Sequence, residues 1–134
     1  MRAAAPARIL LAMVALAGCT ASAELSDTSK ARAERELAKA LAGRTAGEPV
    51  DCIRADRSNG PQIIDGDTLL YREMGTVWRN DLPAACPGMQ PGDILIVEMF
   101  GSQLCSSDRV RAVTPGANIP GPQCRLGKFT PYRK

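Results

Sequence analysis

Residues 62–71 read QIIDGDTLLY, which places an Asp-Gly turn between two runs of β-prone side chains. Asp-Gly in that setting is a strong signal for a β-hairpin. Further short β-prone runs cover residues 76–79, 94–100, 109–113 and 126–129, and glycine- and proline-rich segments separate them. We therefore expect a mainly β domain, built as a small antiparallel barrel or sandwich.

Two of these runs have distinct patterns. Residues 94–100 read ILIVEMF, and this nearly continuous apolar run predicts a central strand that is buried on both faces. Residues 109–113 read RVRAV, and their alternation predicts a half-buried strand with its arginines in solvent. Glu98, at the end of the first run, is expected to face water or to pair with Arg109 or Arg111.

An N-terminal helix is predicted over residues 30–42. The segment is rich in strong helix formers and ends at Gly43. Ala33, Leu37 and Leu41 are spaced four residues apart, so they share one face of the helix. That narrow stripe indicates a helix that docks lightly on the domain or forms part of a tether.

The chain begins with the pattern of an export signal. An apolar run over residues 9–17 follows a positively charged start, and it is far shorter than the roughly 20 residues that a membrane-spanning helix needs. Residues 16–19 read LAGC, the lipobox pattern of bacterial lipoproteins, so Cys19 is the expected site of lipid attachment. Residues 21–23 (ASA) fit an alternative cleavage that would release a soluble periplasmic protein.

These features divide the chain into a signal peptide (1–18), a lipid-anchored tether with a short helix and a linker (19–49), and a β-domain (50–134). We expect the protein in the cell envelope, attached to the membrane by its N-terminal lipid. Thr20 follows the expected lipidation site. In similar bacterial lipoproteins an Asp at this position favours retention in the inner membrane, so Thr20 favours the outer membrane facing the periplasm.

Disulfides are expected to stabilise the β-domain. Cys52, Cys86, Cys105 and Cys124 are widely spaced without a Cys-x-x-Cys pair, which argues against a zinc site and a thioredoxin-like motif. In an oxidising envelope two structural disulfides are the default, and four cysteines allow three pairings. We expect Cys86 to pair with Cys105, and Cys52 with Cys124.

Basic side chains are concentrated near the C-terminus. Residues 101–134 contain six basic side chains and one acidic side chain, Asp108. Among them, Arg109, Arg111, Arg125 and Lys128 are candidates for a contact with a polyanion, which in the envelope means lipid phosphates or lipopolysaccharide and not nucleic acid. The favoured interpretation is plainer: a solvated surface that balances the acidic first part of the chain.

The sequence offers little catalytic chemistry. It contains no histidine, which excludes Ser-His-Asp and Cys-His arrangements. Asp65 and Asp67 flank Gly66, but the further oxygen ligands of a calcium loop are missing, so a plain turn is expected. We predict no catalytic group, metal or cofactor, and no enzyme.

Five short phrases in the β-domain carry a family resemblance: CI at 52–53, RNDL at 79–82, CPG at 86–88, QLCS at 103–106 and CRLGKF at 124–129. Through them the β-domain resembles a family of short, exported proteobacterial proteins, many with signal or lipoprotein leaders, that is classed as a domain of unknown function. The resemblance implies no catalytic or binding residues.

Two functions are compatible with these features. The first is a non-enzymatic binding or accessory module that docks on an envelope protein or an anionic lipid. The alternative is an inhibitor of a hydrolase, a lysozyme or a protease, that inserts a proline-rich loop. The segments 82–92 and 114–122 are the candidate loops.

Overall fold

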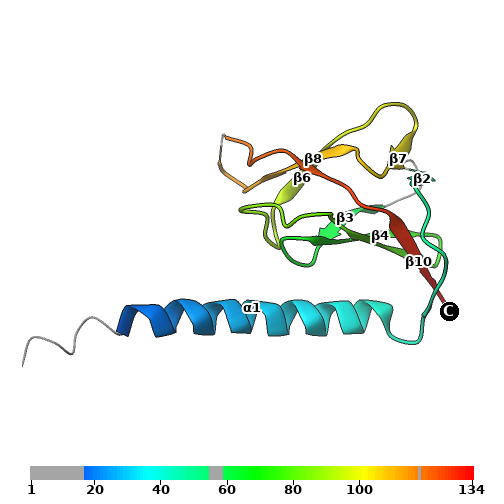
Figure 1. The fold of residues 1–134 in the computed structure, drawn as a ribbon. Helices are drawn as coiled ribbons and strands as arrows, with labels where there is room; N and C mark the ends of the chain where they lie inside the picture. Colours follow the sequence, from blue (N-terminus) through cyan, green and yellow to red (C-terminus); the bar gives the residue numbers. More distant parts are fainter. Residues whose placement is uncertain (1–16, 55–58, 118) are drawn as a thin grey trace, which may run out of the picture. The chain divides into compact units, whose positions relative to one another are not determined.

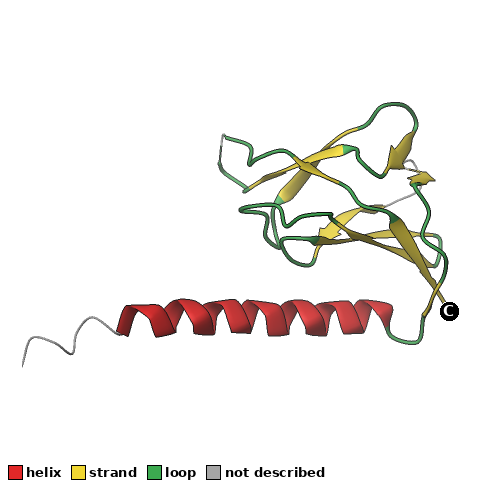
Figure 2. Cartoon of the chain, in the orientation of Figure 1, coloured by secondary structure: helices red, strands yellow, loops and turns green. Residues whose placement is uncertain are grey.

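The computed structural model describes residues 17–54, 59–117 and 119–134, so most of the expected signal peptide lies outside the described residues. The described chain forms one helix and ten strands (Figure 2). They are α1 (Ala17–Leu41), β1 (Thr45–Ala46), β2 (Cys52–Arg54), β3 (Asn59–Ile63), β4 (Thr68–Glu73), β5 (Thr76–Asp81), β6 (Ile94–Glu98), β7 (Gln103–Cys105), β8 (Arg109–Val113), β9 (Cys124–Arg125) and β10 (Phe129–Arg133).

The chain divides into two compact units after Arg32. The first contains the N-terminal part of α1, where residues 24–30 are exposed. The second runs from Ala33 to Lys134 and contains the end of α1 and every described strand. Over the described residues, α1 is not apolar enough to cross a membrane.

The strands of the second unit form three antiparallel sheets (Figure 1). A large sheet has the order β1-β10-β5-β4-β3, a small one has the order β6-β8-β9, and β2 pairs with β7. The sheets do not close into a barrel, and the arrangement is sandwich-like. The expected mainly β, antiparallel fold with an N-terminal helix is confirmed.

The predicted hairpin forms as β3 and β4. Ile63 lies opposite Leu69, and the N–H of Ile64 donates to the carbonyl of Thr68 at 3.0 Å. β4 is the strand that is buried on both faces. Its Leu69 and Tyr71 belong to the main core, whereas Leu70 belongs to the cluster under the helix.

The end of α1 packs on the large sheet. Ala33 is buried there with Leu70 and Val77, and Leu37 and Leu41 pack against the same cluster. The predicted apolar stripe is therefore confirmed, and it docks the helix on the domain. The helix begins earlier than predicted, at Ala17. Because Ala33 belongs to this core, the folded unit extends well before residue 50.

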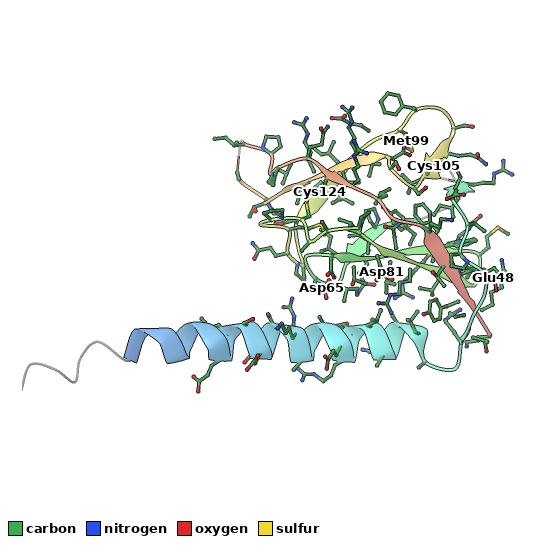
Figure 3. All side chains as sticks on the ribbon, viewed as in Figure 1. Glu48, Asp65, Asp81, Met99, Cys105 and Cys124 are labelled. Carbon is green, nitrogen blue, oxygen red and sulfur yellow. A yellow bond between two sulfur atoms is a disulfide. The ribbon has the colours of Figure 1, made fainter. Side chains whose placement is uncertain are left out.

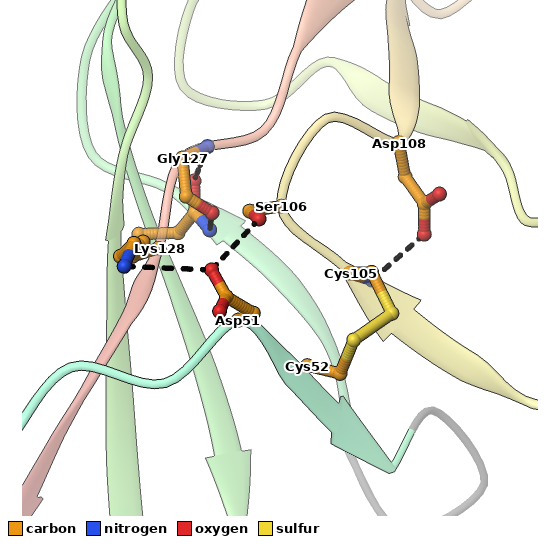
Figure 4. Close-up of a disulfide and its surroundings, with 8 residues drawn as sticks. Asp51, Cys52, Cys105, Ser106, Asp108, Gly127 and Lys128 are labelled. Atoms are coloured by element: carbon orange, nitrogen blue, oxygen red, sulfur yellow. Dashed lines mark hydrogen bonds and ion pairs between the residues drawn. A yellow bond between two sulfur atoms is a disulfide. The ribbon is translucent and has the colours of Figure 1, made fainter.

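The disulfide pairing that we expected is wrong. The structure pairs Cys52 with Cys105 and Cys86 with Cys124. The first pair follows from register, because Cys52 lies directly opposite Cys105 in the β2–β7 ladder (Figure 4). The second pair joins the loop after β5 to β9. It therefore links a segment next to the large sheet with a strand of the small sheet.

The prediction of a central strand over residues 94–100 is also wrong. β6 covers only Ile94–Glu98, and among the described strands it pairs only with β8, so it lies at the edge of its sheet. Leu95 and Val97 pack against the main core, while Ile94 and Ile96 are exposed. Side chains of β6 alternate between the core and solvent as in any half-buried strand. The sequence does not show this alternation, because the solvent-facing residues are apolar as well.

One continuous segment passes from the small sheet to the large sheet between β9 and β10. At the crossing, Asn80 is fully buried, and its Nδ2 donates to the carbonyl of Gly127 at 2.7 Å. The N–H of Gly127 donates back to Asn80 Oδ1 at 2.9 Å. A Cβ on Gly127 would overlap the carbonyl oxygen of Asp81, so only glycine fits at this crossing.

We predict that Asn80→Ala lowers the free energy of unfolding by about 2–4 kcal/mol, because it leaves the buried N–H and carbonyl of Gly127 without partners. Chemical denaturation of the oxidised protein measures this change. Gln62→Ala is the control, since it removes an exposed hydrogen bond to Arg72 and should cost about 0.5 kcal/mol or less. Equal effects of the two substitutions would contradict the role given to Asn80.

Candidate functional site

The solvent-facing side of the small sheet brings together residues from three strands. On β6, Ile94, Ile96 and Glu98 point outward, since the intervening Leu95 and Val97 pack on the core. The outward residues of β6 lie opposite those of β8, and β9 adds one more. We call the outer face the set Ile94, Ile96, Glu98, Arg109, Arg111, Val113 and Arg125.

This face changes in character from one end to the other. Ile94 lies opposite Val113 at the apolar end, and Ile96 lies opposite Arg111 in the middle. At the charged end, Arg109 on β8 lies between Glu98 on β6 and Arg125 on β9. The outer face is therefore amphipathic along the direction of its strands.

Arg109 and Arg125 occupy directly opposite positions on β8 and β9. The carbonyl of Ala112 accepts a hydrogen bond at 2.8 Å from Gly121, which lies on the segment leading to β9. Backbone groups alternate sides along a strand, so Val110 also bonds toward β9 and Arg109 bonds toward β6. Arg109 and Arg125 are thus a non-hydrogen-bonded pair, the kind in which facing side chains are nearest.

The charge of these two arginines is not balanced locally. Within the described chain, neither side chain has an ion pair or a hydrogen bond. The nearby Glu98 is already in use, because its Oε1 lies 3.6 Å from Arg111 Nη2 and its Oε2 accepts from Gln123 at 3.2 Å. The predicted pairing of Glu98 is confirmed with Arg111. Like charges directly opposite each other destabilise a sheet.

Arg111 is the third arginine of the outer face. Its Nε is buried and, within the described residues, has no hydrogen-bond partner. A buried guanidinium N–H without an acceptor costs free energy. Because this nitrogen is buried, it is not accessible to an anion on the solvent side of the outer face.

The structure separates Lys128 from the other three predicted residues. Lys128 Nζ lies 3.6 Å from Asp51 Oδ1, and the same oxygen accepts from the Ser106 hydroxyl at 3.2 Å (Figure 4). Its charge is therefore balanced beside the Cys52–Cys105 disulfide. The predicted set of four basic residues becomes a set of three.

Exposed apolar side chains are concentrated on and beside the outer face. Ile94 is 59% exposed and Ile96 is 45% exposed. The loop after β6 adds Met99 and Phe100, and Phe100 is 79% exposed. Figure 3 shows Met99 far from the turn that contains Asp65. Exposed apolar groups gathered in one region often mark an interaction surface.

A second basic cluster was not predicted. Lys39, Arg44, Arg72 and Lys134 line an open pocket of about 420 Å³ beside the end of α1. Two of its members have structural partners: Arg44 donates to the carbonyls of Gly75 and Tyr132, and Arg72 donates to Gln62. No local sequence pattern identifies this cluster, because its members come from α1, from the segment between α1 and β1, from β4 and from the residue after β10.

Asp65, Asp67 and Tyr71 have structural roles in the folded domain. Asp65 Oδ1 accepts from the backbone N–H groups of Asp67 and Thr68, as expected for a plain turn. Burial and the neighbouring Asp65 raise the pKa of Asp67. Burial also raises the pKa of Tyr71 above its usual range, and its ring packs edge-to-face on Phe129 with centroids 5.7 Å apart.

The two proline-rich loops differ. In the segment 82–92, Leu82, Cys86 and Met89 are buried, and the N–H of Cys86 donates to the carbonyl of Gly66 at 2.7 Å. This loop is anchored on the domain and does not project from it. In the segment 114–122, Ile119 is 82% exposed.

Cys19 lies within the backbone of α1, and its side chain is outside the described part of the structure. Lipid attachment at Cys19 therefore stays a prediction.

No protein-family model, curated protein or solved structure matches the chain. The family resemblance of the β-domain likewise stays a prediction.

We predict that Arg125→Gln stabilises the domain by about 0.2–1 kcal/mol at low salt, because it removes the repulsion from Arg109. The gain should vanish near 1 M salt, where the screening length is about 3 Å. Chemical denaturation at both salt concentrations measures it. The control Lys128→Gln loses its contact with Asp51 and should not stabilise. A loss of stability in Arg125→Gln would contradict the proposed repulsion.

Proposed function

We propose that this protein is a lipid-anchored, non-enzymatic binding module of the cell envelope, which docks on anionic lipid headgroups through the outer face of its small sheet. The observation that carries this proposal is the unbalanced pair formed by Arg109 and Arg125, directly opposite each other on adjacent strands. A domain that is stabilised only by a few kcal/mol does not gain from such a pair in the unbound state.

A phosphate group suits this arrangement. The guanidinium group presents planar, paired N–H donors, and it binds phosphate oxygens with two parallel hydrogen bonds. One phosphate between Arg109 and Arg125 converts their mutual repulsion into two attractions.

The apolar part of the outer face supports a lipid surface as the ligand. Ile94, Ile96 and Phe100 are exposed beside the arginines. Peripheral membrane-binding surfaces combine apolar groups, which enter the headgroup boundary, with basic groups that attract anionic lipids. In the proposed tethered protein, the lipid on Cys19 raises the effective concentration of the domain at the membrane, so weak docking suffices.

We predict that the mature chain, residues 19–134 carrying Cys19→Ser to remove the acyl anchor, binds vesicles that contain phosphatidylglycerol and not vesicles of pure phosphatidylcholine. Each arginine near an anionic surface contributes about 1 kcal/mol, so Arg109→Gln with Arg125→Gln should weaken binding about 30-fold. Vesicle sedimentation at low salt measures the binding.

The matched control is Lys39→Gln with Lys134→Gln, which removes the same charge from the second basic cluster. It should bind almost as tightly as the unchanged chain. Equal losses of vesicle binding in the two double variants would show that binding depends only on net charge, which would contradict a specific role of the outer face. Absence of binding to the anionic vesicles would overturn the proposal. Inhibition of a lysozyme or a protease by the unchanged chain would favour the alternative function.

A further inference from the structure

β6 is an open edge of the small sheet. It pairs with β8 on one side, and among the described segments no backbone hydrogen bond reaches its other side. The remaining sheet edges are less able to pair. β1 and β9 have two residues each, β2 and β7 have three each, and β3 contains Pro61 and an irregular register between Asn59 and Gln62.

β6 lacks the features that usually protect an edge strand. Natural edges are blocked by short length, proline, bulges or inward-pointing charges. β6 has five residues, and the first four of them, Ile94 to Val97, are apolar and β-prone. Such an edge favours pairing with another strand.

The register of the sheet identifies the free backbone groups. Arg109, Arg111 and Val113 bond toward β6, as the hydrogen bond from Gly121 to Ala112 establishes. Their opposite residues, Glu98, Ile96 and Ile94, therefore direct their backbone groups toward β8. The N–H and carbonyl groups of Leu95 and Val97 face the open edge.

We infer that β6 pairs with β6 of a second copy of this chain, antiparallel about a twofold axis at Ile96. In this register, Leu95 of each copy exchanges both backbone hydrogen bonds with Val97 of the other copy. The Ile96 side chains of the two copies face each other at the axis. The two small sheets become one continuous sheet, and their outer faces lie on the same side.

A second copy fits this edge because the edge is self-complementary. The segment Ile94–Val97 carries no charge, so antiparallel pairing brings no like charges together at its centre. The two Glu98 side chains lie at opposite ends, each across from Ile94 of the other copy. A twofold contact of this kind closes on itself, so it leaves no open edge on β6 for further growth.

The inference is independent of the proposed function, because it needs no lipid. It is tested by sedimentation velocity of the mature chain, residues 19–134 with Cys19→Ser and both disulfides formed, in lipid-free buffer. We expect a concentration-dependent dimer. Ile96→Lys places two like charges face to face at the axis, so it should raise the dissociation constant of the dimer at least tenfold. Ile96 is exposed, so the substitution should leave the fold intact.

Met74→Lys is the matched control. Met74 is 86% exposed on the turn between β4 and β5, so this variant should stay dimeric, as should Arg109→Gln with Arg125→Gln. Amide hydrogen exchange gives a second readout: the Leu95 and Val97 amides should exchange slowly in the dimer and rapidly in Ile96→Lys. A monomeric unchanged chain would overturn the inference. A dimer that Ile96→Lys leaves intact, or in which Leu95 and Val97 exchange rapidly, would overturn it too.

Discussion

The two hydrogen bonds between Asn80 and Gly127 determine how the sheets of this small domain are joined. They form at the point where one continuous segment leaves β9 in the small sheet and enters β10 in the large sheet. Gly127 must lie against the backbone of Asp81 there, and no side chain fits in the space. The Cys86–Cys124 disulfide, three residues earlier, holds the same segment from its other end. The position of Arg125 beside Arg109 follows from this crossing.

The outer face therefore lowers the stability of the domain through the repulsion between its arginines, yet covalent and backbone contacts fix its position. The disulfide and the crossing hold β9 next to β8, although this register places Arg109 opposite Arg125, and neither has a partner among the described residues. Small domains have only a small free energy of unfolding, and we propose that a ligand balances the charge of this pair. The exposed apolar residues of β6 belong to the same face. In the proposed dimer, the outer faces of the two copies lie side by side on one continuous sheet.

Local patterns were sufficient for the parts of the fold that depend on neighbours in sequence. The Asp-Gly hairpin and the stripe formed by Ala33 and Leu37 were predictable, because turn chemistry and helical period are local. The disulfide pairing was not, since it depends on the pairing of two three-residue strands that are far apart in sequence. The exposure of β6 was not predictable either, because the same apolar sequence occurs in a strand whose second face packs on a core and in one whose second face contacts a partner. The arginines of the candidate site were identified, but their opposition on adjacent strands needed the register.

We propose that the outer face, and not the basic pocket beside α1, binds the anionic group. The most direct measurement is a ¹H–¹⁵N NMR titration of the oxidised mature chain, residues 19–134 with Cys19→Ser, with a short-chain phosphatidylglycerol. We expect saturable shifts confined to residues 94–100 and to the surroundings of Arg109 and Arg125. Shifts centred on Lys39 and Arg44, or no saturable shifts, would contradict it.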